Sequence, residues 1–312
     1  ASIAKKANPN VVTAQGGPNF PHDDAQQIDF LKNRPSTDIF MIMEAEKTTV
    51  NLINRIIDSK LVRKKIFSSP IDGTVFIRPE SSKSNKLFKG APSSRIKYLD
   101  EIPSPYLNGM LDRFFDGKLA PFIETNRGCP FKCSFCHTGN DYFNKINMFS
   151  VERINAEIGY IAEKSANLGI SHLHIADTNY GMYPRDREIT KALFDSHTKY
   201  GWPNSIMSTT GKNQKQRVID ITNILGNLFE VSMSAQSMDE NVLNNIRRSN
   251  ISLEAYKDIN KHLQDSGRST NAELIMLLPG ETKESFINGI SKIVDSGIAS
   301  LTIYTLMLLH GT

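Results

Sequence analysis

The stretch Glu124-Thr-Asn-Arg-Gly-Cys-Pro-Phe-Lys-Cys-Ser-Phe-Cys136 contains every cysteine of the 312-residue chain, namely Cys129, Cys133 and Cys136. Three thiols packed this closely cannot make a disulfide framework, and the pattern indicates a reducing compartment and a metal or cofactor site. Each thiolate can bind one iron of a four-iron cluster, which leaves the fourth iron open to a ligand with its own amine and carboxylate. The sequence therefore predicts a [4Fe-4S] cluster on this loop.

Two other kinds of site also fit three cysteines. Zinc needs four ligands, and His137 beside Cys136 is the conceivable fourth, although adjacent residues rarely both reach one tetrahedral ion. A non-catalytic iron–sulfur protein for electron transfer would normally supply a fourth cysteine, whereas this chain has three. The spacing favours a cluster with an open iron, and His137 is expected to be a loop residue.

From residue 119 onward, apolar segments rich in β-branched residues alternate with helical ones, which is typical of an α/β fold. Ser150 and Thr282 are expected to cap two of the helices. Six strand–helix units are fewer than the eight of a closed barrel, so we expect a partial (β/α)6 TIM-like barrel over residues 119–312. The cysteine loop directly follows its first strand, on the face where such barrels build active sites. The expected strands are 119–125, 171–176, 205–209, 228–234, 271–278 and 301–308.

Residues 1–78 alternate in the same way and predict part of a Rossmann-like, doubly wound domain. Its first strand ends at Gly16 and Gly17, and a helix over residues 46–57 places Val50, Ile53 and Ile57 on one apolar face. The expected strands are 11–14, 38–43 and 74–77, and the other expected helix is 22–32. The linker between the domains is expected at 79–118, which is polar and interrupted by prolines and ends in a short amphipathic helix over 107–115.

Composition narrows the class of protein. Hydrophobic residues make up 39% of the chain and charged residues 22%, so a packed core is expected. A net charge of +4 is too mild to indicate a nucleic-acid partner. The longest apolar run, 301–309, is about half the length of a membrane span, and no signal peptide is visible, so a soluble, cytoplasmic protein is expected. Both ends look cut, since residue 1 is not methionine and residue 312 directly follows an apolar strand.

The segment 119–308 resembles the radical S-adenosylmethionine (SAM) superfamily, whose signature is this cysteine triad on the first strand–helix loop of a partial barrel. The resemblance implies that SAM binds the open iron of a [4Fe-4S] cluster. One electron then cleaves SAM to methionine and a 5′-deoxyadenosyl radical. It also implies a partner that supplies the electron, such as flavodoxin or ferredoxin.

The resemblance extends to single positions near the first two strands. Phe135 stands where the family usually has an aromatic residue near the adenine of SAM, although loop packing explains it equally well. Asp177 and Asn179 end the second strand, where the family contacts the methionine amine. An Asx turn would explain these two residues as well.

A second group of positions follows the fourth and fifth strands. Ser234 and Gln236, with Arg248 downstream, resemble the family's Gln-Ser segment and the arginine that can reach the SAM ribose and carboxylate. A surface arginine is the alternative for Arg248. The turn that begins at Leu278 resembles a family turn reading Gly-Leu-Pro-Gly, but Leu277 replaces its first glycine, which puts a close backbone approach to SAM in doubt.

The amino-terminal domain resembles the closing half of the cobalamin-binding domain that often precedes radical SAM barrels. There the turn at Gly16 and Gly17 would let the backbone approach the nucleotide tail of cobalamin. Met43 and Ala45 stand where glycines are common in that family, and paired glycines also occur in ordinary Rossmann turns. The resemblance implies cobalamin as a further cofactor. With it, the expected chemistry is methyl transfer to an unactivated carbon or phosphorus of a small-molecule or unknown substrate.

Sulfur insertion into a transfer RNA base, as in the methylthiotransferases, is the alternative reaction within the superfamily. That subclass resembles the same barrel but carries additional amino-terminal cysteines, and none stands before Cys129. The mild net charge also argues against a transfer RNA substrate. Methyl transfer or another radical reaction on a small molecule is therefore the favoured interpretation.

Overall fold

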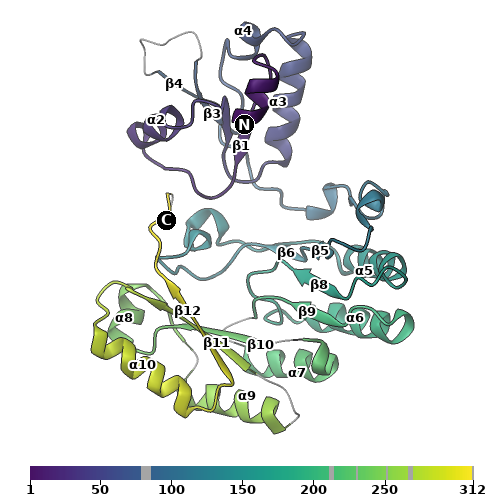
Figure 1. Cartoon of the computed structure of the whole chain (residues 1–312), viewed down its shortest axis with the longest axis vertical. Coiled ribbons are helices and arrows are strands. Elements are labelled where there is room, and N and C mark those ends of the chain that lie inside the picture. Colours follow the sequence, from purple (N-terminus) through teal and green to yellow (C-terminus); the bar gives the residue numbers. More distant parts are fainter. Residues whose placement is uncertain (79–85, 211–213, 230, 251, 266–269, 311–312) are drawn as a thin grey trace. The chain divides into compact units, whose positions relative to one another are not determined.

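The computed structural model describes residues 1–78, 86–210, 214–229, 231–250, 252–265 and 270–310 (Figure 1). The chain divides into two compact units, residues 1–96 together with the carboxy-terminal residues from 308, and residues 97–307. This boundary differs from the expected linker at 79–118. Strand β4 (Leu87–Lys89) belongs to the first unit because it pairs with β3, and residues from 97 onward belong to the second. Residues 79–85 of the expected linker lie outside the described residues.

The first unit is built on one sheet, whose strands lie in the order β1 (Ala14–Gly16), β2 (Ile39–Met41), β3 (Thr74–Ile77) and β4. Only β1 and β2 pair in parallel within it, whereas β3 and β4 are antiparallel to their neighbours, so the expectation of a doubly wound parallel sheet holds for the first pair alone. The strands expected at 38–43 and 74–77 and the helices expected at 22–32 and 46–57 are present with slightly different bounds, whereas the first strand lies at 14–16 and not at 11–14. The helices of this unit are α1 (Ser2–Ala7), α2 (Asp24–Lys32), α3 (Glu46–Asp58) and α4 (Arg63–Ile66).

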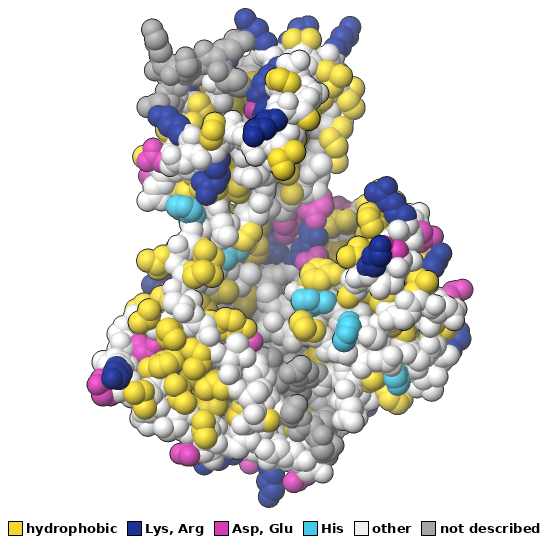
Figure 2. Space-filling model, in the orientation of Figure 1, with side chains coloured by type: hydrophobic (Ala, Val, Ile, Leu, Met, Phe, Trp, Pro, Cys, Tyr) yellow, Lys and Arg dark blue, Asp and Glu magenta, His cyan; other side chains and the backbone are white. Residues whose placement is uncertain are grey.

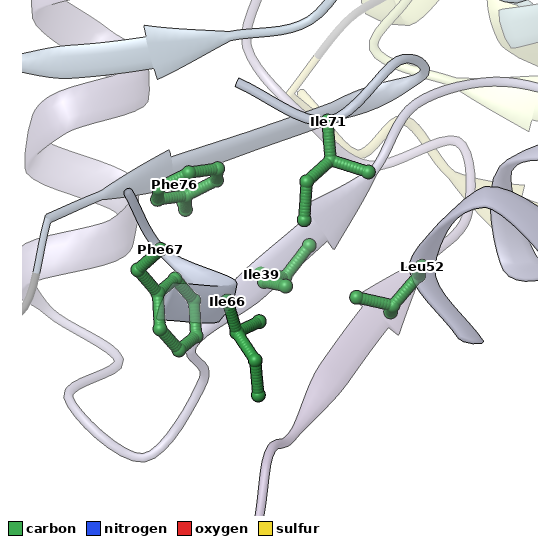
Figure 3. Packing of buried hydrophobic residues seen from close by; sticks show 6 residues of the cluster. All are labelled: Ile39, Leu52, Ile66, Phe67, Ile71 and Phe76. Atoms are coloured by element: carbon green, nitrogen blue, oxygen red, sulfur yellow. The ribbon is translucent and has the colours of Figure 1, made fainter. Parts of the chain in front are cut away.

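Both faces of this sheet are covered by apolar side chains. Successive residues of a strand point to opposite faces, so Ile39 and Phe40 enter two different clusters, as do Phe76 and Val75. Figure 3 shows the cluster on one face, formed by Ile39, Leu52, Ile66, Phe67, Ile71 and Phe76. The cluster on the other face contains Phe20, Phe30, Leu31, Phe40 and Val75.

Helix α3 turns a different face to the sheet than its apolar pattern predicts. Val50, Ile53 and Ile57 are 55%, 48% and 64% exposed, and hydrophobic side chains gather over this helix in Figure 2. The buried side chains are those of Thr48 and Leu52, one helical turn apart. The expected helix is thus confirmed, and the expected buried face is wrong.

The second unit contains a run of parallel strands in chain order. Strands β5, β8 and β9 form one sheet, β10, β11 and β12 form another, and a parallel bridge between Ile206 and Phe229 joins β9 to the segment that leads into β10. In the described part of the chain this gives six strands with helices between them, and Figure 1 shows α5, α6 and α7 on one side of β8 and β9. The partial (β/α)6 barrel is therefore confirmed. The strands are β5 (Phe122–Ile123), β8 (His172–Ile175), β9 (Ser205–Met207), β10 (Val231–Gln236), β11 (Thr270–Met276) and β12 (Ser300–Thr305). The helices are α5 (Val151–Ser165), α6 (Asp186–Tyr200), α7 (Lys215–Leu225), α8 (Glu240–Asn245), α9 (Leu253–Asp265) and α10 (Lys283–Asp295).

Two of the helices begin as their sequences predict. Ser150 Oγ accepts a hydrogen bond from the backbone N–H of Arg153, and Thr282 forms a capping box with Ser285. The amphipathic helix expected over 107–115 is wrong, because only a 3-10 turn forms at Asp112–Phe114. Among the described residues, no helix combines the length and apolar character needed to cross a membrane.

Two residues that replace family glycines adopt the left-handed backbone conformation that favours glycine. Met43 has φ of +62° and Leu277 has φ of +68°. Leu277 directly follows β11, and its side chain is 69% exposed, so packing does not compensate for the steric cost of this conformation. The chain keeps the path of a glycine turn at both places without having glycine.

We expect Leu277→Gly to leave the free energy of unfolding unchanged or to raise it by up to about 1 kcal/mol. The left-handed conformation costs a residue with a side chain about 1–2 kcal/mol, and glycine gives back about 0.4–1 kcal/mol through the freedom of the unfolded chain. Denaturant titration measures the change, with Leu278→Ala as the control. Leu278 is 2% exposed, so its truncation should cost about 2–5 kcal/mol. A loss above about 1 kcal/mol for Leu277→Gly would contradict the expectation.

Candidate functional site

The three cysteines lie on a closed loop that follows β5. Strand β6 (Asn126–Arg127) pairs with β7 (Asn147–Met148) and brings the two ends of this loop together. Inside it, the backbone N–H of Cys129 donates to Phe143 O over 2.9 Å, and that of Cys136 donates to Cys133 O over 3.1 Å. All three thiols are free; Cys129 and Cys133 are buried and Cys136 is partly exposed. The structure therefore places the predicted ligands together on one tightly wound segment.

Two glycines allow this loop to wind so closely. A Cβ atom at Gly128, where φ is +120°, would lie 2.6 Å from Lys145 O, and one at Gly139 would lie 2.2 Å from Cys133 O. Neither position has room for a side chain, because the obstacles are backbone atoms that cannot move away alone. The close winding of the loop therefore requires glycine at both positions.

A polar group lies within hydrogen-bonding distance of each cysteine sulfur. Asn179 Nδ2 lies 3.3 Å from Cys129 Sγ, and Arg248 Nη1 lies 3.9 Å from Cys133 Sγ. Thr138 Oγ1 lies 3.1 Å from Cys136 Sγ. Two other parts of the barrel and the cysteine loop itself thus supply hydrogen-bonding groups to the three sulfurs.

The sulfurs do not form a finished metal site in this structure. Within the part of the chain that is described, no three side chains of His, Cys, Asp or Glu are gathered closely enough to hold a metal ion. The donor set nevertheless suits iron and sulfide, because three thiolates share one loop that leaves no room for other side chains at two positions. His137 packs its ring edge-on against Phe143, with 4.8 Å between centroids, which is the loop role expected of it.

Asp177 anchors the entrance of the cysteine loop. Its carboxylate accepts hydrogen bonds from the backbone N–H groups of Thr125 (2.8 Å) and Asn126 (3.3 Å), from Asn126 Nδ2 (2.7 Å) and from the Thr125 hydroxyl. The residue is 2% exposed, and burial raises the pKa of this carboxyl from 3.8 to about 7. Both oxygens are used inside the protein. The structure thus gives Asp177 a positioning role, and its contact with SAM stays a prediction.

Asn179 carries an unused acceptor beside the first cysteine. Its amide nitrogen donates to Cys129 Sγ and to Thr178 Oγ1, while its Oδ1 has no hydrogen-bond partner among the described residues. The residue is 1% exposed, so this oxygen is also shielded from water. A buried carbonyl oxygen without a donor is costly and indicates a ligand that supplies the donor. This observation agrees with the prediction that Asn179 faces a cofactor.

Gln236 shows the same feature on β10. It lies at an irregularity in the pairing of β10 with β11, its φ is +69°, and its Oε1 has no partner within the described residues. Ser234 and Arg248 are less available than expected, because an Arg248 Nη donates to Ser234 O and the Ser234 hydroxyl donates to Glu273. Arg248 is 6% exposed, so the alternative of a surface arginine is wrong.

Phe135 takes the packing role that was left open for it. It packs against Val242, Ile246 and Leu278, and the neighbouring backbone N–H of Ser134 donates to Ile246 O over 2.9 Å. These contacts fasten the middle of the cysteine loop to the barrel from the side of α8. The structure provides no separate support for an adenine contact at this position.

Two residues near the site escaped sequence reasoning. The hydroxyl of Tyr183 has no partner among described residues, and burial, together with the nearby Cys129 and Asp186, raises its pKa to about 12. Asp186 holds this turn through the backbone N–H groups of Gly181 and Tyr183, at 2.8 Å and 3.0 Å. Burial raises the pKa of Asp186 to about 6. The sequence signal that could have identified this turn is an aspartate at the start of a helix, three residues after a tyrosine.

An apolar cavity of about 270 Å³ lies elsewhere in this unit, at the beginning of β5. The cysteine loop follows the other end of the same strand, so the cavity and the candidate site lie at opposite ends of β5. The residues that line the cavity are Tyr106, Leu111, Phe114, Phe115, Leu119, Ala120, Pro121 and Phe122.

Comparison with known families agrees with this geometry. Residues 123–293, from β5 into α10, match the radical SAM superfamily. The chain belongs to this superfamily. The match includes the cysteine loop and the polar positions that surround it.

Two curated relatives are methyltransferases from bacteria. The 2-(S-pantetheinyl)-carbapenam-3-carboxylate methyltransferase of Streptantibioticus cattleyicolor is 32% identical over 95% of this chain and 42% of its own length. The cobalamin-dependent radical SAM methyltransferase TokK of Streptomyces tokunonensis is 30% identical over 99% of this chain and 44% of its own length. The chain thus spans less than half of these relatives.

Solved structures share the fold at low sequence identity. The radical SAM methyltransferase TsrM of Kitasatospora setae, solved with cobalamin and a [4Fe-4S] cluster, matches with a TM-score of 0.67 at 12% identity. The match covers 95% of this chain and 55% of TsrM. The cobalamin-dependent radical enzyme OxsB matches with a TM-score of 0.63 at 14% identity, over 94% of this chain and 40% of OxsB. These similarities establish the arrangement of elements.

We expect Asp177→Asn to reduce the dependence of stability on pH. Because the folded-state pKa of about 7 lies above the ordinary 3.8, protonated Asp177 stabilises the fold below about pH 4. This contribution falls as the pH rises towards 7. Denaturant titrations between pH 4.5 and 7.5 should give a shallower slope for the variant, by at most about 1.4 kcal/mol per pH unit.

Asp195→Asn, on the exposed surface of α6, is the matched control and should keep the wild-type slope. A part of the slope should survive in Asp177→Asn, because the pKa of Asp186 is also raised. An Asp177→Asn slope equal to that of the wild type would show that this carboxyl does not titrate as the geometry requires.

Proposed function

We propose that this chain is part of a radical SAM enzyme that binds a [4Fe-4S] cluster through Cys129, Cys133 and Cys136 and cleaves SAM. The observation that carries the proposal is the set of three free thiols on the loop after β5, each with its own hydrogen-bonding neighbour. When bound, the cluster supplies the electron that splits SAM into methionine and a 5′-deoxyadenosyl radical. Membership of the superfamily supports the same assignment.

In this proposal the residues of the chain bind SAM and hold the cysteine loop in place. Asn179 Oδ1 and Gln236 Oε1 are buried acceptors that await donors, and an ammonium group or ribose hydroxyls can supply them. Asp177 holds the loop entrance in place through backbone and side-chain hydrogen bonds. Phe135 packs the loop against α8 and keeps water away from its inner side.

We further propose cobalamin as the second cofactor and methyl transfer to a small molecule as the reaction. The names of the two curated relatives support this assignment. Gly16 and Gly17 also fit it, because both are exposed and nothing lies within 4 Å of a Cβ atom built on Gly17. A ligand can therefore approach this backbone closely. An electron-donating protein such as flavodoxin or ferredoxin completes the proposal, in a reducing compartment that keeps the thiols free.

Anaerobic reconstitution tests the cluster. With iron and sulfide the protein should take up about four irons per chain, since each ligand cysteine holds one iron and the fourth stays open. Dithionite and SAM should then yield 5′-deoxyadenosine and methionine, measured by chromatography. Cys133→Ala should lose both the cluster and the product.

Two other residues of the cysteine loop serve as controls for this experiment. Ser134→Ala should retain the cluster, since Ser134 has an exposed side chain on the same loop. His137→Ala should also retain it and thereby disfavours the zinc alternative. A protein that binds zinc in place of iron, or that holds a complete cluster without cleaving SAM, would contradict the proposal.

Cobalamin binding is expected to depend on the turn after β1. A titration followed by cobalamin absorbance should show binding to the protein and at least tenfold weaker binding to Gly17→Val, because a side chain would fill the open approach. The control is Gly201→Val, which places a side chain at another glycine of positive φ with nothing within 4 Å. Equal affinity of Gly17→Val and the wild type would remove this turn from the cobalamin site.

A further inference from the structure

The three sulfurs of the cysteine loop differ in the group that faces them. Cys129 faces an amide from the segment after β8, Cys133 faces a guanidinium from the segment after α8, and Cys136 faces a hydroxyl of its own loop. The sulfur–donor distances are 3.3, 3.9 and 3.1 Å. Among the described residues, the three sulfurs thus have chemically distinct hydrogen-bonding partners.

The direction of these hydrogen bonds is fixed once the sulfurs bind iron. Amide and guanidinium nitrogens can only donate. Either Thr138 or the free thiol of Cys136 can donate between them, but a sulfur bound to iron carries no proton, so the Thr138 hydroxyl must then be the donor. All three contacts become donor-to-sulfur hydrogen bonds in the loaded protein.

We propose that Asn179, Arg248 and Thr138 raise the reduction potential of the cluster through these three hydrogen bonds. The inference rests on the proposed function. A one-electron reduction, with dithionite as the electron source, adds negative charge that spreads onto the cysteine sulfurs, and no bond is made or broken. Donors aimed at the sulfurs stabilise the reduced form more than the oxidised form.

Burial and charge rank the three donors. Cys133 is 5% exposed and faces a cation, so the field of Arg248 acts on it with little screening by water. Cys129 is 6% exposed and faces a neutral amide. Cys136 is partly exposed and faces a neutral hydroxyl. We therefore expect Arg248 to have the largest influence and Thr138 the smallest.

The Arg248 guanidinium is held in place for this role. Its Nε donates to Asn250 Oδ1 over 2.9 Å, and the other side of the fork donates to Ser234 O. Asn250 is fixed in turn by Nδ2 hydrogen bonds to Ala235 O and Ser237 O, at 2.8 Å and 2.9 Å. Because β10 and the turn after it hold this network, the charge lies at a constant position relative to Cys133. Arg248 is therefore expected to stabilise the reduced cluster through its fixed charge and does not itself react.

The test is a redox titration of the reconstituted protein, followed by electron paramagnetic resonance without SAM. Thr138→Val keeps the shape of the side chain and removes the donor, and it should make reduction severalfold less favourable. Thr138→Ser keeps the hydroxyl and should behave as the wild type. Arg248→Met should make reduction at least tenfold less favourable, which is about 59 mV for a one-electron couple, while Arg248→Lys should recover part of the shift.

Iron content separates this inference from the proposed function. If the wild type holds no four-iron cluster, the proposed function fails and this inference falls with it. If Thr138→Val carries four irons per chain at the wild-type midpoint potential, the inference is overturned and the proposed function stands. Should Arg248→Met not assemble a cluster, the Thr138→Val and Thr138→Ser pair decides, because Thr138 makes no other side-chain hydrogen bond among those described around this loop.

Discussion

The buried carboxylate of Asp177 is the interaction on which the candidate site depends. Asp177 lies at the end of strand β8, next to β5. Its carboxylate accepts hydrogen bonds from Thr125 and Asn126, the residues that lead into the cysteine loop. A two-residue strand such as β5 has few ladder hydrogen bonds of its own, so this carboxylate supplies the fixed point from which the loop is built. Without Asp177, the entrance of the loop would be held by the short pairing of β5 with β8, while Phe135 and Ser134 would still attach its middle to the barrel. The raised pKa of Asp177 shows that burial of its charged form has a cost here, which the four hydrogen bonds offset only in part.

Two buried hydrogen-bond acceptors without a donor indicate that the site binds a ligand. Asn179 Oδ1 and Gln236 Oε1 lie on different strand ends, are both shielded from water, and lack partners among the described residues. Each such atom destabilises the protein by about 1–3 kcal/mol until a donor arrives. A ligand that provides both donors therefore gains affinity from groups that the protein has already desolvated.

Sequence alone predicted the fold well where hydrophobic pattern and local chemistry agree. The strand positions of the barrel, the caps at Ser150 and Thr282 and the closeness of the cysteines follow from periodicity and spacing. It failed where a choice depends on tertiary contacts. The apolar face of α3 remains exposed because Thr48 and Leu52 face the sheet instead. Sequence could not distinguish an arginine at the surface from one buried against Cys133, since only the folded barrel brings these residues together across 115 positions.

At two positions where the family pattern has glycine, this chain has a different side chain but keeps the backbone conformation of a glycine turn. Met43 and Leu277 both keep the left-handed conformation of the glycines they replace, so a missing glycine does not imply a missing turn. At the end of β11 the consequence is chemical, because an exposed leucine side chain stands on the face of the barrel where active sites are built. The doubt that Leu277 raises about a close approach of the backbone to SAM stays a prediction, while the structure shows that its side chain adds apolar surface. The steric cost of the left-handed conformation at Leu277 is therefore not offset by packing of its side chain within the described part of the chain.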